Sequence, residues 1–401
     1  MCSLSAEIIG GNGDLLGLIF IHLPVRSLAR FKSVSQQWLA LIANSKFRLK
    51  HTLENPSSRI PSGLFLYNPV FKDNTVHSIS LSGFGGKIPT CADPIELPDD
   101  VPIKSMKLRA DENVMLMVHS CNGLNLFRFN TFDNQMKSYC VRNLVTNQLK
   151  FVPLPKFDGD NYEWISSCYL AFDPLVSPHY KVICVKGMNR IGSKILIFSS
   201  ETGKWRDTNV TMDDHKLEYA IGDYCHGAIY WIERGYLKLS CYRFDIEAEI
   251  MTEISMPTTA DGPNFRHFGA SYGHLYLVCV RDQKEKVFNV FELNQITMKW
   301  SIKHWVHVNR LISSFPQVVA KGRNNTSPSA FSVLSVVRGE EDSALVMNIS
   351  GEVISYNLRS KKVEVLLSEL NWEVQSRRRV EIASLSPIIS AYPFIATLYP
   401  L

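Results

Sequence analysis

The feature that most constrains this chain is a change in the spacing of its apolar residues after about residue 62. From Asp14 to about His51, large apolar side chains recur every three or four residues, which is the period of a helix. Beyond Gly63 they come in short runs rich in Val, Ile, Tyr and Phe, separated by Gly, Asn, Asp and Pro, a pattern typical of strands and turns. The sequence therefore predicts a small all-α unit followed by an all-β domain.

The domain boundaries follow from breaks in the helical spacing. The spacing is interrupted twice, which predicts three short helices. The polar stretch from His51 to Ser62 contains two prolines and several turn-forming residues, and it predicts a linker. We therefore divide the chain into a helical unit at residues 8–50, a linker at residues 51–62 and a β-domain at residues 63–401.

The strands of the β-domain follow a loose repeat of an apolar run, a tight polar turn and a second apolar or aromatic run. The turn centres fall near residues 146, 202, 248, 297 and 360. Their spacing of roughly 45–60 residues lies in the range of four-stranded propeller blades with loop insertions. The repeat predicts a β-propeller of six to eight blades, with seven preferred, closed by pairing of the tail Pro387–Leu398 with the strand near Leu64–Tyr67.

Composition argues against several classes of protein. A net charge of +5 with 20% charged residues falls short of the dense basic surface of a nucleic-acid binder. No apolar run approaches the ~18 residues of a membrane helix, and no basic segment precedes Leu15–Ile21 as it would in a secretory signal. The nine cysteines, never spaced as CxxC, suit reduced thiols. We expect no nucleic-acid partner, no membrane partner and a cytoplasmic and/or nuclear location.

The sequence shows no clear catalytic or metal-binding constellation. His304 and His307 are the closest histidine pair, but no Cys or acidic cluster completes a four-ligand set near them. The glycine clusters at 10–13 and 83–86 lack the strand-then-helix setting of phosphate-binding loops. We expect no catalytic residue, no metal and no cofactor. Four cysteines in strand-like runs are expected to act as small apolar core residues: Cys168, Cys184, Cys241 and Cys279.

The segment Gly13–Ala43 resembles the F-box in the order of its landmarks. Its acidic start, Asp14–Leu16, leads to Leu23–Val25 and then to Trp38. One departure is that Gly11–Gly13 stands where the F-box usually opens with Leu-Pro, which predicts a weaker affinity for the adaptor than is typical of the family.

Burial supports the same interpretation, because a unit of about forty residues cannot cover this many large apolar side chains internally. Some of them are then buried by a partner, which in an F-box protein is a Skp-family adaptor. The alternative is that these helices pack on the chain's own β-domain and bind nothing. The residues expected to contact the adaptor are Leu15, Leu16, Ile19, Leu23, Pro24, Val25, Leu28, Phe31, Val34 and Trp38.

The β-region resembles the F-box-associated, kelch-like domain of the large plant F-box families. The matching phrases are Ser120–Leu124, Tyr169–Pro174, Ser199–Arg206 and Gly227–Trp231. The resemblance implies a substrate receptor in an SCF-type ubiquitin ligase, linked through its adaptor to cullin and RING subunits. Such a receptor brings a target lysine close to the conjugating enzyme and performs no chemistry itself.

The sequence does not identify the target protein. Because loops vary while strands hold the scaffold, we expect target contacts in loops, with Asp158–Trp164 and Asn189–Ser193 as candidates. The alternative from another class is a propeller enzyme or ligand-binding protein whose N-terminal helices are only structural. Adaptor binding distinguishes the two.

Overall fold

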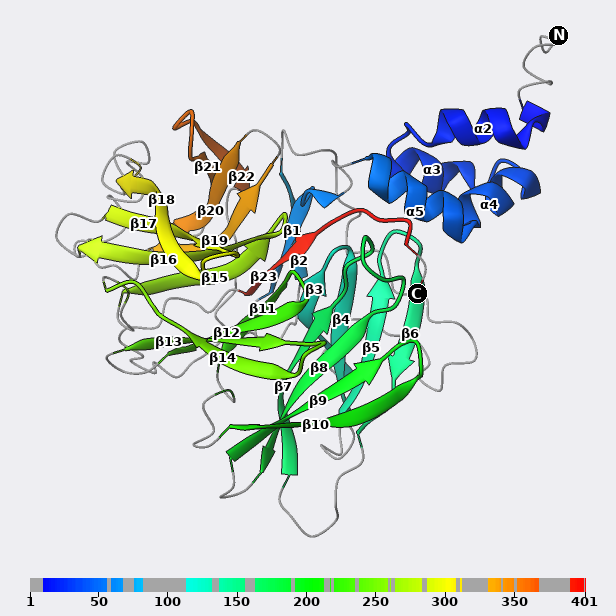
Figure 1. Cartoon of the computed structure of the whole chain (residues 1–401). Helices are drawn as coiled ribbons and strands as arrows, with labels where there is room; N and C mark the ends of the chain where they lie inside the picture. The colour runs from blue at the N-terminus through cyan, green and yellow to red at the C-terminus, as the bar shows by residue number, and fades with distance from the viewer. Residues whose placement is uncertain are drawn as a thin grey trace.

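The chain folds into a small helical unit beside a ring of β-sheets (Figure 1). The computed structural model describes residues 10–55, 59–67, 76–81, 113–131, 137–155, 163–188, 192–212, 217, 220–234, 238–258, 260, 264–282, 287–307, 311, 331–339, 342–349, 352–367, 390–399 and 401.

The helical unit contains four short helices, so the prediction of three is wrong by one. They are α2 (Gly13–Phe20), α3 (Val25–Phe31), α4 (Gln36–Ala43) and α5 (Ser45–Glu54). The last helix lacks a regular apolar stripe, because three of the four residues that it buries are Arg48, His51 and Thr52. It extends to Glu54, so the first residues of the stretch predicted as a linker are helical.

Side chains of the preceding residues cap three of the four helices. The Asn12 side chain accepts hydrogen bonds from the backbone N–H groups of Asp14 and Leu15, at the position where the F-box pattern has Leu-Pro. Ser35 and Asn44 cap α4 and α5 in the same way. Such caps satisfy N–H groups that have no partner within the helix. The altered entry to the F-box therefore still starts a helix.

The β-domain is a six-bladed propeller (Figure 1). Five blades are four-stranded antiparallel sheets in sequence order, and the sixth has three described strands in the order β2-β1-β23. The strands are β1 (Gly63–Tyr67), β2 (Val76–Ser80), β3 (Asn113–Cys121), β4 (Leu124–Thr131), β5 (Lys137–Asn143), β6 (Gln148–Val152), β7 (Glu163–Ala171), β8 (Lys181–Met188), β9 (Gly192–Ser199), β10 (Lys204–Met212), β11 (Ile221–Cys225), β12 (Ala228–Arg234), β13 (Leu239–Asp245), β14 (Ile250–Ile254), β15 (Phe265–Ser271), β16 (His274–Asp282), β17 (Val287–Asn294), β18 (Lys299–His307), β19 (Phe331–Arg338), β20 (Ser343–Ile349), β21 (Glu352–Asn357), β22 (Val363–Leu367) and β23 (Ser390–Phe394).

The preferred number of seven blades is wrong, although six lies within the predicted range. The innermost strands begin at residues 113, 163, 221, 265, 331 and 390. Most of these intervals exceed the ~40–50 residues assumed for a blade, because long connections separate several of them. A separate cluster of buried apolar side chains fills each of the six spaces between neighbouring blades.

The repeat seen in the sequence corresponds to the hairpin between the third and fourth strands of each four-stranded blade. In four of these hairpins a side-chain oxygen at the start of the turn accepts two backbone N–H groups. A residue with positive φ near the end of the turn completes the hairpin in all five blades. The side chains that accept these bonds are Asn143, Asp245, Asn294 and Asn357.

The ring closes as predicted, by pairing of the C-terminal strand with the first strand. β23 runs antiparallel to β1, with Phe65 opposite Tyr392 and Gly63 opposite Phe394. The rings of Phe65 and Phe394 pack edge to face at 5.4 Å, and both side chains are buried. The sixth blade therefore joins the two ends of the β-domain.

Two cysteines differ from the prediction of reduced thiols. Cys168 on β7 and Cys184 on β8 stand opposite each other and form a disulfide. Cys241 and Cys279 are free and buried in the core, as expected.

Closure of the ring can be tested at Gly123, in the turn between β3 and β4. Its φ is +88°, and a Cβ there would lie 2.8 Å from the carbonyl oxygen of Ile395, with the Thr397 methyl closer still. Gly227 occupies the equivalent turn between β11 and β12, with φ of +76° and nothing within 4 Å of its Cβ position. Both Gly→Ala changes incur the left-handed backbone cost of about 1–2 kcal/mol. We expect Gly123→Ala to lose about 1–3 kcal/mol more, from the clash with the C-terminal segment.

Chemical denaturation of the two variants checks this expectation. Equal losses of unfolding free energy would show that the segment after β23 yields without cost, and that it does not hold the ring closed.

Candidate functional site

The helical unit has an aromatic centre. The rings of Phe20, Phe31 and Trp38 pack against one another, with centroids 4.9 to 5.6 Å apart. Aromatic pairs in such tilted and edge-to-face arrangements contribute beyond their buried area. Trp38 is therefore partly a core residue of the unit.

The unit also packs on the β-domain through the end of the chain. Leu398 belongs to the buried cluster of the helices, and Val145 and Ala396 pack against it. Val145 lies in the turn between β5 and β6, and Ala396 and Leu398 follow β23. The chain's own propeller thus covers one side of the helices, as one of the two alternatives anticipated.

Hydrogen bonds from α5 hold the corner between α2 and α3. The Nε2 atom of His51 lies 2.8 Å from the carbonyl oxygen of Leu23, and Asn55 Nδ2 donates to the carbonyl oxygen of Ile21 at 2.7 Å. Because a carbonyl can only accept, Nε2 carries the proton of His51. Burial lowers the pKa of His51, which keeps the ring neutral.

The structure divides the residues predicted to bind an adaptor into three groups. Leu16, Val25 and Leu28 are fully buried inside the unit. Leu23, Phe31 and Trp38 are partly buried against the same cluster. The exposed members are Leu15, Ile19, Pro24 and Val34.

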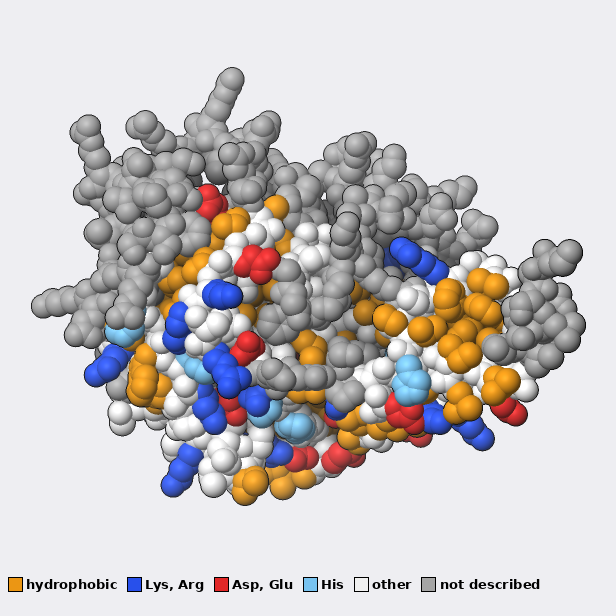
Figure 2. All heavy atoms as spheres, turned by 90° about the horizontal axis from the view of Figure 1, so that it is seen from above, with side chains coloured by type: hydrophobic (Ala, Val, Ile, Leu, Met, Phe, Trp, Pro, Cys, Tyr) orange, Lys and Arg blue, Asp and Glu red, His pale blue; other side chains and the backbone are white. Residues whose placement is uncertain are grey.

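An apolar surface remains on the helices after these contacts are made. On α2, Leu15, Leu18 and Ile19 are 39%, 60% and 47% exposed, and they share one helical face. Val34 before α4 and Leu39 on α4 add further exposed side chains. α2 lies on the side of the unit away from the propeller (Figure 1), and hydrophobic side chains gather at that end of the molecule in Figure 2. Leu18 and Leu39 were missed because they are not F-box landmarks.

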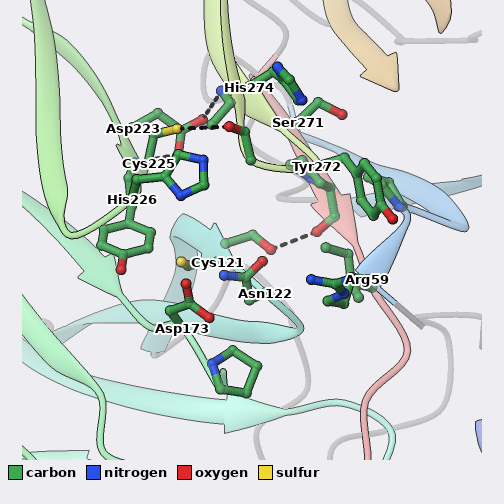
Figure 3. Close-up of a pocket in the computed structure, with 18 of the residues that line it drawn as sticks. Arg59, Cys121, Asn122, Asp173, Asp223, Cys225, His226, Ser271, Tyr272 and His274 are labelled. Atoms are coloured by element: carbon green, nitrogen blue, oxygen red, sulfur yellow. Dashed lines mark hydrogen bonds between the residues drawn. The ribbon is translucent and has the colours of Figure 1, made fainter. Parts of the chain in front are cut away.

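A pocket of about 280 Å³ opens at one mouth of the propeller's central channel. Tight turns that join the two inner strands of three blades line it, at Asn122-Gly123, His226-Gly227 and Tyr272-Gly273. Both residues of each turn have positive φ, which is the geometry of a type I′ hairpin. Asp173, Asp223 and Arg59 bring charged groups to the same space (Figure 3).

Beneath this pocket, His119 and Asp223 form a buried pair. The Leu170 N–H donates to Nδ1 of His119 at 3.1 Å, so the ring proton is on Nε2, 3.2 Å from Asp223 Oδ1. The Asp223 carboxylate also accepts the backbone N–H groups of Tyr224 and Ala270. The histidine is thus held neutral and structural by bonds at both nitrogens.

The nearby thiol of Cys121 is not an activated nucleophile. It donates to the carbonyl oxygen of Phe172, and burial raises its pKa well above the usual value, with Asp223 and Asp173 adding to the rise. Reactive cysteines have lowered pKa values instead. The arrangement of Cys121, His119 and Asp223 therefore lacks the activation that nucleophilic catalysis needs.

Comparison with known families agrees with this geometry. Residues 13–50 match the F-box domain family, and residues 90–326, more than half of the chain, match the family described as "F-box associated beta propeller domain". The chain is a member of the F-box-associated β-propeller family. The predicted F-box followed by an F-box-associated domain is confirmed.

Relatives in Arabidopsis thaliana share this organisation of the F-box protein. "F-box protein At5g07610" is 28% identical over 393 residues, which cover 91% of this chain and 87% of the relative. "F-box/WD-40 repeat-containing protein 1" is 22% identical and covers 96% of this chain and 88% of its own length. None of the helices in the described part of this F-box protein is long and apolar enough to cross a membrane.

The loops predicted to contact a target lie away from the mouth pocket. Most of 158–164 and 189–193 falls outside the described residues. The described parts, Glu163–Trp164 and Gly192–Ser193, stand where β7 and β9 begin, at the opposite end of that blade from the turn holding Asp173. The pocket residues were missed because they come from separate blades and only the ring brings them together.

The environment of His267 on β15 predicts a pH dependence of stability. Burial lowers the pKa of His267 to about 4, with Asp223 opposing the shift. The unfolded chain then binds this proton more readily, so stability is lost as pH falls from about 6.5 towards 4. Between pH 7 and pH 5 the loss amounts to at most about 2 kcal/mol.

Urea denaturation at these two pH values measures the effect. His267→Gln should lose less stability than the unmodified protein on acidification, whereas His179→Gln, at an exposed position, should lose as much. The same loss in all three proteins would contradict the assignment.

Proposed function

We propose that this F-box protein is the substrate-recognition subunit of an SCF-type ubiquitin ligase. Its N-terminal helices bind a Skp-family adaptor, which links it to cullin and RING subunits. Its propeller binds a target protein. The proposed location is the cytoplasm and/or the nucleus.

The observation that carries this proposal is the apolar surface left exposed on the F-box. Leu15, Leu18 and Ile19 line the face of α2 that points away from the propeller. Burying a large aliphatic side chain contributes about 1.5–3 kcal/mol, so a partner that covers this face gains substantial free energy. The match to the F-box family over residues 13–50 supports an adaptor as that partner.

The structure changes which residues are proposed to touch the adaptor. Leu16, Val25 and Leu28 support the surface from within, because they are buried in the unit. Direct contacts are assigned to Leu15, Ile19, Pro24 and Val34, with the edge of the half-buried Trp38. The proposed receptor is non-catalytic, which agrees with the neutral His119 and the protonated Cys121 at the mouth of the propeller.

The adaptor surface is tested by Ile19→Glu. A charge at this exposed position leaves the core of the F-box intact but cannot be buried against an apolar partner without a large desolvation cost. We expect the affinity for a recombinant Skp-family adaptor, measured by calorimetry, to fall by at least about 10-fold, or ~1.4 kcal/mol. The melting temperature should stay unchanged.

The matched control is Leu53→Glu. Leu53 is 51% exposed, close to the 47% of Ile19, but it lies on α5, on the side of the unit near the propeller. This variant should bind the adaptor normally. If Ile19→Glu binds as well as Leu53→Glu, or if the unmodified chain does not bind, the proposal fails. Trp38→Ala is a poorer test because it also removes the aromatic centre.

A further inference from the structure

The mouth pocket lies on the face of the propeller that carries the F-box. Arg59 and Pro61, which line it, follow α5 by a few residues. Pro393 and Ile395 also line it, and the next residues, Ala396 and Leu398, pack on the F-box helices. A group bound in the pocket is therefore close to the F-box.

One side of the pocket carries two carboxylates, Asp173 and Asp223 (Figure 3). Both raise the pKa values of Cys121 and Cys225, which places both charges near the same pair of thiols. With burial as the main cause, the pKa of Cys225 rises to about 12, so the thiols are neutral. This wall of the pocket thus combines negative charge with uncharged sulfur.

No basic side chain neutralises this wall within the described parts of the chain. The partner of Asp223 is His119, whose single ring proton leaves it uncharged. Asp173 forms no ion pair among the described residues, and its Oδ1 accepts only the backbone N–H of Leu175 at 3.0 Å. The guanidinium of Arg59 lies across the pocket, 5.6 Å from the ring centre of Tyr272. The Asp173 carboxylate is therefore available to a ligand.

The rim beside Asp173 is apolar and open. Leu175, which lines the pocket, is 40% exposed, and Val176 next to it is 82% exposed. Exposed aliphatic side chains next to a charged pocket suit a protein segment, which can bury a neighbouring apolar residue while its charged side chain enters. The volume of about 280 Å³ suits one or two side chains rather than a large cofactor.

We propose that the mouth pocket binds a lysine or arginine side chain of the target protein, with the cation beside Asp173 and an adjacent apolar residue on Leu175 and Val176. This inference rests on the proposed receptor function, which it extends by naming the chemistry of the target. It is specific to the pocket, because the net charge of the whole chain is +5 and does not attract basic peptides.

The test uses the immobilised full-length protein and pools of acetylated, amidated nonapeptides with random flanking positions. The central residue of each pool is fixed as Arg, Lys, norleucine or Glu. We expect the Arg and Lys pools to be retained at least about 5-fold better than the norleucine and Glu pools. Asp173→Asn should abolish this preference, because Asn keeps the oxygen that accepts the Leu175 N–H but removes the charge.

Glu201→Gln is the matched control, since Glu201 is an exposed carboxylate in the outer turn between β9 and β10. It should leave the preference unchanged. Better retention of the Glu pool, lost in Arg59→Gln, would show that the target presents an acidic group and would overturn the proposal. Equal retention of all pools, or none, would overturn it as well.

Adaptor binding is measured on the same samples. If every variant binds the adaptor but the peptide preference is absent, the inference about the target fails and the receptor function stands. If adaptor binding is absent in the unmodified protein, the receptor function itself fails.

Discussion

The pairing of β23 with β1 is the contact on which the rest of the structure depends. Without it the inner strands form an open arc, and the apolar clusters on both sides of the sixth blade lose one wall. The same strand positions Pro393 and Ile395 in the mouth pocket. Its continuation, Ala396 and Leu398, covers the F-box helices. One short strand thus supports the ring, the pocket and the placement of the F-box.

Much of the fold could be predicted from local patterns. Side-chain alternation and turn residues report on neighbours in the sequence, so the hairpins at 146, 202, 248, 297 and 360 were found. The blade number was overestimated because long connections make the intervals uneven. The fourth helix was missed because α5 buries Arg48 and His51, whose hydrogen bonds to Ile42 and Leu23 do not show as an apolar stripe.

The functional surfaces were predicted less completely, for a related reason. An apolar residue in a helix reads the same whether it faces its own core, as Leu28 does, or solvent, as Ile19 does. Only the packing of Leu398 and Ala396 on the unit decides which is which. The pocket combines Arg59, Asp173 and Asp223 from segments far apart in the chain. Long-range convergence of this kind has no local signature.

The C-terminal cover of the F-box has a consequence for how the protein is made. Synthesis delivers residues 10–55 first and Leu398 almost last. Domains generally fold as units in the order of synthesis, but here the F-box helices complete their hydrophobic core only with residues from the far end of the chain. A truncated or stalled chain therefore carries an unfinished F-box. The fold itself thus links assembly with an adaptor to completion of the propeller.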